Sequence, residues 1–150
     1  MNKKYQVLKK KHNLPEFKEL DKEFSIGKLE ETDYPLRTIT NKISERLEHV
    51  TKILLDIIQP DSNLANMYEA ENFSDEEKKK IFELLKKISY HQKELLINDF
   101  AYDEADAAKL IKKCFEEWKE LKQEFLEILE KIKESWRKET KSRLELSYFG

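Results

Sequence analysis

Apolar side chains return every three or four positions through much of this sequence, and that spacing constrains its fold more than any other feature. Between residues 35 and 58 the recurring positions are Leu36, Ile39, Ile43, Leu47, Val50, Leu54 and Ile57. Steps of three and four place side chains on one face of an α-helix, because the helix turns once every 3.6 residues. Pro35 is tolerated in a first turn, and Pro60 ends the pattern. The spacing therefore predicts a helix from Pro35 to Ile58, capped by Thr32 or Asp33.

A second helix is predicted to begin at Ser74. Ser74 and Glu77 have the spacing of a capping box, in which the hydroxyl accepts from the N–H three residues on and the carboxylate reaches back. The apolar stripe that follows consists of Ile81, Leu84, Leu85, Ile88, His91 and Leu95. The stripe fades between Asn98 and Tyr102, where we expect the helix to end.

A third helix is predicted from Asp103 to beyond Arg143. Its stripe alternates steps of four and three through Ala107, Ile111, Cys114, Trp118, Leu121, Phe125, Ile128 and Ile132. This is a near-continuous heptad pattern, which predicts left-handed, coiled-coil-like packing. A helix this long would overhang the other two, so its distal part, including Ile132 and Trp136, needs cover. We expect that cover from the N-terminal segment or from a second copy of the chain.

The remaining segments complete one predicted all-α domain over residues 1–150. Residues 1–12 are expected to be a basic, flexible tail. Residues 13–31 are expected to hold a short helix that opens at Pro15, followed by a linker through Gly27. The connection over residues 59–73 is long for a link between helices and is predicted to contain one helical turn. The predicted fold is thus an all-α bundle in which three long helices span residues 32–150 and the short N-terminal helix lies beside them.

Composition sets several function classes aside. The chain contains 2 Gly and 3 Pro, which argues against a turn-rich β-sandwich and against a glycine-lined phosphate or dinucleotide cradle. A net charge of −2 provides no overall attraction to nucleic acid or to an anionic membrane. Cys114 is the only cysteine, so neither an intramolecular disulfide nor a cysteine-based zinc site is expected. No signal peptide or membrane-spanning run is recognised, so we expect a cytoplasmic protein.

The pattern supports neither a metal site nor a nucleophilic cysteine. Glu45 with His49, and His91 with Glu94, have spacings that suit a carboxylate–histidine metal site in a helical bundle. The first pair falls outside the apolar stripe, and a lone stripe histidine such as His91 is more often a hydrogen-bonded core residue. Cys114 lies on a stripe, where a thiol is usually inert. We therefore predict no catalytic, cofactor-binding or metal-binding residue, and catalysis is unsupported.

Basic residues at both ends suggest a nucleic-acid surface as an alternative function. The candidates are Lys9, Lys10, Lys11, Arg137, Lys138, Lys141 and Arg143. Cationic clusters with nearby aromatic side chains suit phosphate backbones and stacked bases. Two simpler explanations compete with this one. The cations near a helix C-terminus complement the helix dipole, and a short lysine-rich tail serves as a solubilising end. The acidic stretch between Glu16 and Asp33 is a further candidate to pair with this tail within the molecule.

The leading hypothesis is a non-catalytic interaction or scaffold module that self-associates or acts as an adaptor in a larger complex. The apolar residues predicted to face a protein partner are Leu64, Met67, Tyr68, Trp136, Tyr148 and Phe149. They lie in the connection over 59–73 and near the C-terminal end, where exposed apolar clusters mark partner sites. An RNA- or DNA-binding accessory protein is the second hypothesis, and a carboxylate–histidine metal-binding bundle is the third and weakest.

Overall fold

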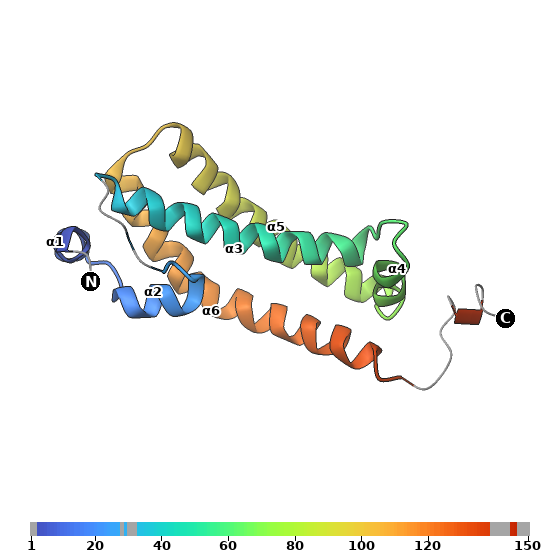
Figure 1. Ribbon diagram of the computed structural model, residues 1–150. Helices are drawn as coiled ribbons and strands as arrows, with labels where there is room; N and C mark the ends of the chain where they lie inside the picture. Colours follow the sequence, from blue (N-terminus) through green and yellow to red (C-terminus); the bar gives the residue numbers. More distant parts are fainter. Residues whose placement is uncertain (1–2, 28, 30–32, 139–144, 147–150) are drawn as a thin grey trace. The chain divides into compact units, whose positions relative to one another are not determined.

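A computed structural model describes residues 3–27, 29, 33–138 and 145–146 of the chain. Every regular element in these residues is an α-helix, and the helices pack against one another, so the all-α bundle is confirmed. The helices are α1 (Lys3–His12), α2 (Phe17–Phe24), α3 (Pro35–Ile58), α4 (Leu64–Ala70), α5 (Asp75–Phe100) and α6 (Glu104–Ser135) (Figure 1).

The predicted apolar stripes form the core. All seven stripe residues of α3 and all six of α5 are buried, and the stripe of α6 is buried from Ala107 to Phe125. Ile128 and Ile132, farther along α6, are half-buried. The three long helices therefore bury the faces that the three-and-four spacing selects.

Side-chain caps fix where two of the long helices begin. The Glu77 N–H donates to Ser74 Oγ at 3.1 Å, and the Ser74 N–H donates to Glu77 Oε1 at 3.0 Å, which confirms the capping box at the start of α5. The Asp106 N–H donates to Asp103 Oδ2 at 3.2 Å, which caps α6 where its start was predicted. Such caps satisfy N–H groups that lack a partner inside the helix.

The basic N-terminal segment is a helix from Lys3 to His12, where a flexible tail was predicted. Tyr5 of α1 is completely buried, its ring meets Phe17 edge-on at 5.5 Å, and its hydroxyl donates to the Pro15 carbonyl. One buried aromatic residue anchors a helix whose other residues are largely lysine. The short helix that follows begins at Phe17 rather than Pro15.

The far end of α6 also differs from the prediction. The helix stops at Ser135 instead of continuing beyond Arg143, a residue that lies outside the described part of the chain. Within unit 2 this end is covered by α4, which was not among the expected sources of cover. Cover by a second copy of the chain stays a prediction. The Tyr68 ring packs 4.6 Å from the Trp136 ring, and the Tyr68 hydroxyl donates to the Ser135 carbonyl, where it satisfies an unpaired group of the last turn.

The chain divides into two compact units. Unit 1 comprises Met1–His49 and Ser89–Lys119, and unit 2 comprises Val50–Ile88 and Glu120–Gly150. Helices α1 and α2 belong to unit 1 and α4 belongs to unit 2, whereas α3, α5 and α6 contribute residues to both. That the chain unfolds as one domain stays a prediction.

Candidate interaction surfaces

The last three turns of α5, in unit 1, expose large apolar side chains. Tyr90, Ile97 and Phe100 are 61%, 68% and 85% exposed, and Leu96 beside them is also exposed. Steps of seven and three put the first three on one face of the helix, opposite the buried Leu95. We call Tyr90, Leu96, Ile97 and Phe100 the α5 face. Because single exposed apolar residues are ordinary but contiguous ones mark binding sites, this face is the first candidate surface.

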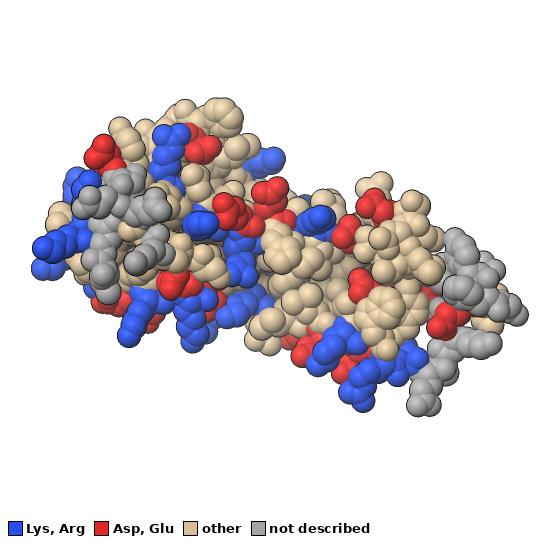
Figure 2. Space-filling view, in the orientation of Figure 1, with Lys and Arg blue, Asp and Glu red and all other residues tan. Residues whose placement is uncertain are grey.

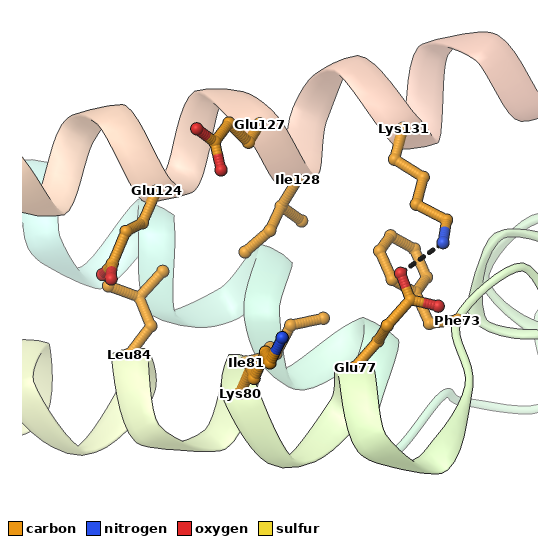
Figure 3. Close-up of a pocket in the computed structure, with 9 residues that line it drawn as sticks. All are labelled: Phe73, Glu77, Lys80, Ile81, Leu84, Glu124, Glu127, Ile128 and Lys131. Atoms are coloured by element: carbon orange, nitrogen blue, oxygen red, sulfur yellow. Dashed lines mark hydrogen bonds and ion pairs between the residues drawn. The ribbon is translucent and has the colours of Figure 1, made fainter.

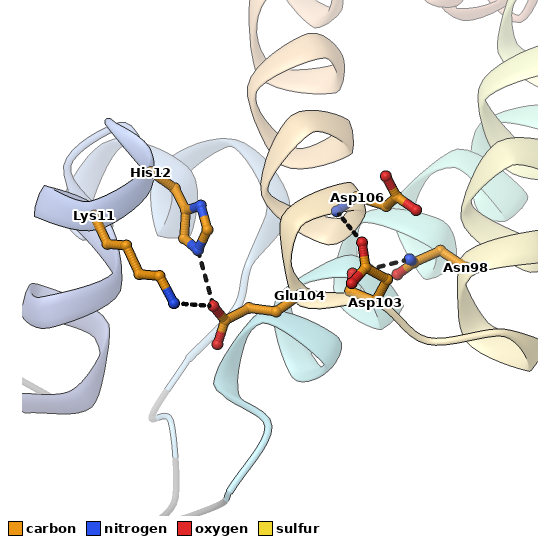
Figure 4. A network of polar contacts seen from close by, with 6 residues as sticks. All are labelled: Lys11, His12, Asn98, Asp103, Glu104 and Asp106. Atoms are coloured by element: carbon orange, nitrogen blue, oxygen red, sulfur yellow. Dashed lines mark hydrogen bonds and ion pairs between the residues drawn. The ribbon is translucent and has the colours of Figure 1, made fainter.

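A groove of about 260 Å³ borders the α5 face, between the last turns of α5 and the first turns of α6. Its lining comprises Glu94, Ile97, Asn98, Ala101, Asp106, Lys109 and Leu110. Asn98 is buried and its Nδ2 donates to the Asp103 carbonyl at 3.3 Å, which fixes the turn between the two helices (Figure 4). The two walls of the groove therefore meet at a turn that is held by a buried hydrogen bond.

Charged side chains surround the α5 face. Lys113 Nζ contacts Glu94 Oε1 at 3.1 Å and lies 5.0 Å from the centre of the Tyr90 ring, and the hydrogen bond with Glu94 raises the pKa of Lys113. Lys93 and Lys109 are exposed and make no ion pair with any described residue. The exposed carboxylates of Asp103 and Asp106 lie at the α5–α6 turn. The face thus has cations along its length and carboxylates at its end.

His91 is buried in the core of unit 1 between two carboxylates. Its Nε2 contacts Glu117, and its Nδ1 lies 3.8 Å from Glu94 Oε1 and has no hydrogen-bond partner among the described residues. Within the described chain no three His, Cys, Asp or Glu side chains come together as ligands of one metal ion. Glu45, of the other spacing weighed for a metal, lies on the surface and pairs with Lys42 at 3.5 Å. These contacts fit a hydrogen-bonded core histidine.

Cys114, on α6 in unit 1, is also buried. Burial raises the pKa of its thiol to about 12, and the neighbouring carboxylates of Glu94 and Glu117 act in the same direction. Since the thiolate is the nucleophile, such an environment suppresses reactivity.

Two of the predicted partner-binding residues, Tyr68 and Trp136, contact each other within unit 2. Tyr68 packs on Trp136, and the Trp136 Nε1–H donates to Glu69 Oε2 at 2.7 Å. Leu64 is exposed, Met67 is half-buried, and both lie on α4 with Tyr68. Tyr148 and Phe149 lie outside the described residues. Binding of a partner by the described members of this set stays a prediction.

The predicted nucleic-acid residues are mostly engaged in polar contacts within their own unit. Lys9 pairs with Glu16, and Lys11 Nζ and His12 Nε2 both contact Glu104 Oε2, at 3.0 and 2.9 Å (Figure 4). These two contacts lower the pKa of Glu104. Lys10 is exposed without an ion pair in the described chain.

In unit 2, Arg137 lies 3.7 Å from Glu134, and Lys138 donates to Asn72 at 2.6 Å. Lys141 and Arg143 fall outside the described residues. Figure 2 shows lysine and arginine side chains gathered over the α1 end, with carboxylates among them. The pairing of Lys9 with Glu16 agrees with the expected pairing between the basic segment and the acidic stretch, and nucleic-acid binding stays a prediction.

A second groove lies within unit 2, between the first turns of α5 and the last turns of α6 (Figure 3). Its volume is about 280 Å³. It is lined by Phe73, Glu77, Lys80, Ile81, Leu84, Glu124, Glu127, Ile128 and Lys131. An apolar floor with a charged rim is the usual anatomy of a protein–protein contact surface.

The sequence interpretation missed both the α5 face and the unit 2 groove. A signal for the face was present, because Leu95, Leu96 and Ile97 form an apolar run that one helix face cannot bury completely. The groove has no comparable signal, because its lining comes from residues that are far apart in the sequence.

None of the described helices is long and apolar enough to cross a membrane. Comparison of the chain with protein-family models, curated proteins and solved structures finds no match.

Proposed function

We propose that this protein is a non-catalytic helical interaction module that self-associates through the α5 face. The observation that carries the proposal is the exposure of Ile97 and Phe100, at 68% and 85%, on neighbouring turns of one helix. Full burial of an Ile or Phe side chain gains roughly 1.5–3 kcal/mol, so two from each copy would gain roughly 6–12 kcal/mol. Association costs roughly 4–15 kcal/mol in lost freedom of motion. The two terms are comparable, so losing both side chains should abolish association.

A second copy is the occupant that the charges favour. In a two-fold, antiparallel pairing of α5 helices centred on Ile97, positions equidistant from Ile97 face each other. Lys93 of one copy then lies near Ala101 of the other, beside the turn that carries the exposed carboxylate of Asp103. The same contact occurs twice, as in any isologous interface. The attraction between Lys93 and Asp103 thus supports this pairing of two copies.

The test is the molar mass of the protein in solution, measured by size-exclusion chromatography with light scattering over a wide concentration range. We expect a dimer at high concentration that dissociates on dilution. The double variant Ile97→Asp/Phe100→Asp should be monomeric and keep the circular-dichroism spectrum of the parent. Val7→Asp is the matched control, because Val7 is an exposed apolar residue on another helix of the same unit. A monomeric parent at every concentration, or a double variant that dimerises like the parent, would refute the proposal.

A further inference from the structure

The unit 2 groove has an apolar floor that is large enough for the side chains of a bound segment. Phe73, Ile81 and Leu84 form most of the floor, and Ile128 projects from α6 above it (Figure 3). A groove of about 280 Å³ between two helices suits one or two apolar side chains of an amphipathic segment.

An ion pair closes one end of the groove. Lys131 Nζ contacts Glu77 from the opposite wall and lies 5.1 Å from the centre of the Phe73 ring. Glu77 also caps α5 through the Ser74 N–H. The charges at this end are therefore already compensated and hold the two walls together.

The α6 wall keeps carboxylates that are not compensated in this way. Glu124 and Glu127 are both exposed at the rim. Glu124 reaches Lys87 only at 4.0 Å, and Glu127 makes no ion pair with a described residue. An uncharged segment in the groove would remove water from these carboxylates without replacing it, which is unfavourable. A segment with Lys or Arg beside its apolar residues would compensate them.

We propose that the unit 2 groove binds an amphipathic, basic helical segment of a partner protein. Leu, Ile or Phe side chains of the segment occupy the apolar floor, and its Lys or Arg side chains face Glu124 and Glu127. Lys80, on the α5 wall, disfavours cations on that side and so favours one orientation of the segment. This site lies in a different unit from the α5 face, and its occupancy does not depend on self-association. Together the two surfaces would make the protein an adaptor.

The probe is a fluorescently labelled helical peptide built from Leu and Lys with a single apolar stripe, compared with a peptide in which every Lys is replaced by Glu. We expect fluorescence anisotropy to detect binding of the Leu–Lys peptide and at least tenfold weaker binding of the Leu–Glu peptide. Glu124→Lys/Glu127→Lys should weaken binding of the Leu–Lys peptide at least tenfold and strengthen binding of the Leu–Glu peptide. Both substituted residues are exposed, so the fold should tolerate the change.

The matched control is Glu48→Lys/Glu116→Lys, which changes the net charge equally at exposed positions of unit 1. It should bind the Leu–Lys peptide like the parent. If the control variant and the groove variant lose the same affinity for the Leu–Lys peptide, the effect comes from overall charge and the proposal is overturned. Equal affinities of the parent for the two peptides would also overturn it. Repeating the titration with Ile97→Asp/Phe100→Asp separates the two surfaces, because this variant should lose dimerisation and retain peptide binding.

Discussion

At the scale of single residues, Glu77 has two roles in unit 2. Its carboxylate caps α5 and pairs with Lys131 of α6, so it connects the start of one helix with the last turns of another. The hydrogen bond from Lys131 is the main reason that the pKa of Glu77 falls to about 2, and the backbone N–H of Ser74 adds to the effect. A carboxylate whose pKa is lower in the folded state than in the unfolded state stabilises the fold only while it is ionised.

Glu77→Gln should therefore make stability less dependent on pH in acid. In the parent, the ionised carboxylate of Glu77 contributes to the free energy of unfolding. This contribution is complete above the unfolded-state pKa near 4.5 and is lost as the pH falls toward about 2. The variant should be less stable at neutral pH, and its difference from the parent should shrink across that window. Urea unfolding at a series of pH values measures this difference. Glu83→Gln is the control and should show little change, because Glu83 is exposed and, among the described residues, pairs with Lys86 of the same helix alone. A difference for Glu77→Gln that stays constant with pH would contradict the account.

Cys114 provides a second test at this scale. Because burial raises the pKa of its thiol to about 12, the native protein should not react with a thiol reagent such as 5,5′-dithiobis(2-nitrobenzoic acid) at mildly alkaline pH. Unfolding in urea should release one reactive thiol per chain. Rapid labelling of the folded protein would show that Cys114 is accessible and would contradict its position in the core.

At the scale of helices, α1 depends on one anchor. Tyr5 is its buried residue, whereas Val7 on the same helix is exposed. Tyr5→Ala should lower the free energy of unfolding by roughly 3–5 kcal/mol, as for other large aromatic residues removed from a core. Val7→Ala should change it by less than about 0.5 kcal/mol, as is usual for surface substitutions. Urea unfolding monitored by circular dichroism compares the two, and similar values for both variants would show that α1 does not pack as described.

The helices that periodicity predicted well are those whose buried face recurs over many turns. In α3 the stripe from Leu36 to Ile57 leaves no alternative to a long helix, and the capping box placed the start of α5 correctly. Helix α1 was not predicted because a single aromatic residue among lysines forms no apolar stripe. The burial of Tyr5 depends on Pro15 and Phe17, which lie outside the helix.

The candidate surfaces were less predictable than the helices. Periodicity identifies the face that a helix buries, but it does not show whether a second apolar face also finds cover. Ile97 and Phe100 stay exposed because no neighbouring element reaches them in the described chain. Tyr68 and Trp136, which were predicted to face a partner, contact each other across α4 and the end of α6. Partner binding by these two residues stays a prediction.

At the scale of the whole molecule, we expect one cooperative unfolding transition. Helices α3, α5 and α6 contribute residues to both units, so a helix that melts in one unit removes packing from the other. Ile43→Ala in unit 1 and Ile57→Ala in unit 2 should each destabilise the protein by roughly 2–5 kcal/mol. Each should shift the same transition when ellipticity and tryptophan fluorescence are recorded together. Two separate transitions, each sensitive to only one substitution, would contradict this expectation.

The most direct test of self-association through the α5 face is oxidative cross-linking at its centre. In a Cys114→Ala background, Ile97→Cys places the only thiol where two antiparallel α5 helices would cross. Glu48→Cys, in the same background, places it at an exposed site on α3. Mild oxidation should convert the Ile97→Cys protein to a covalent dimer much faster than the Glu48→Cys protein, because only the first brings two thiols within bonding reach. Equal rates for the two proteins would contradict the account.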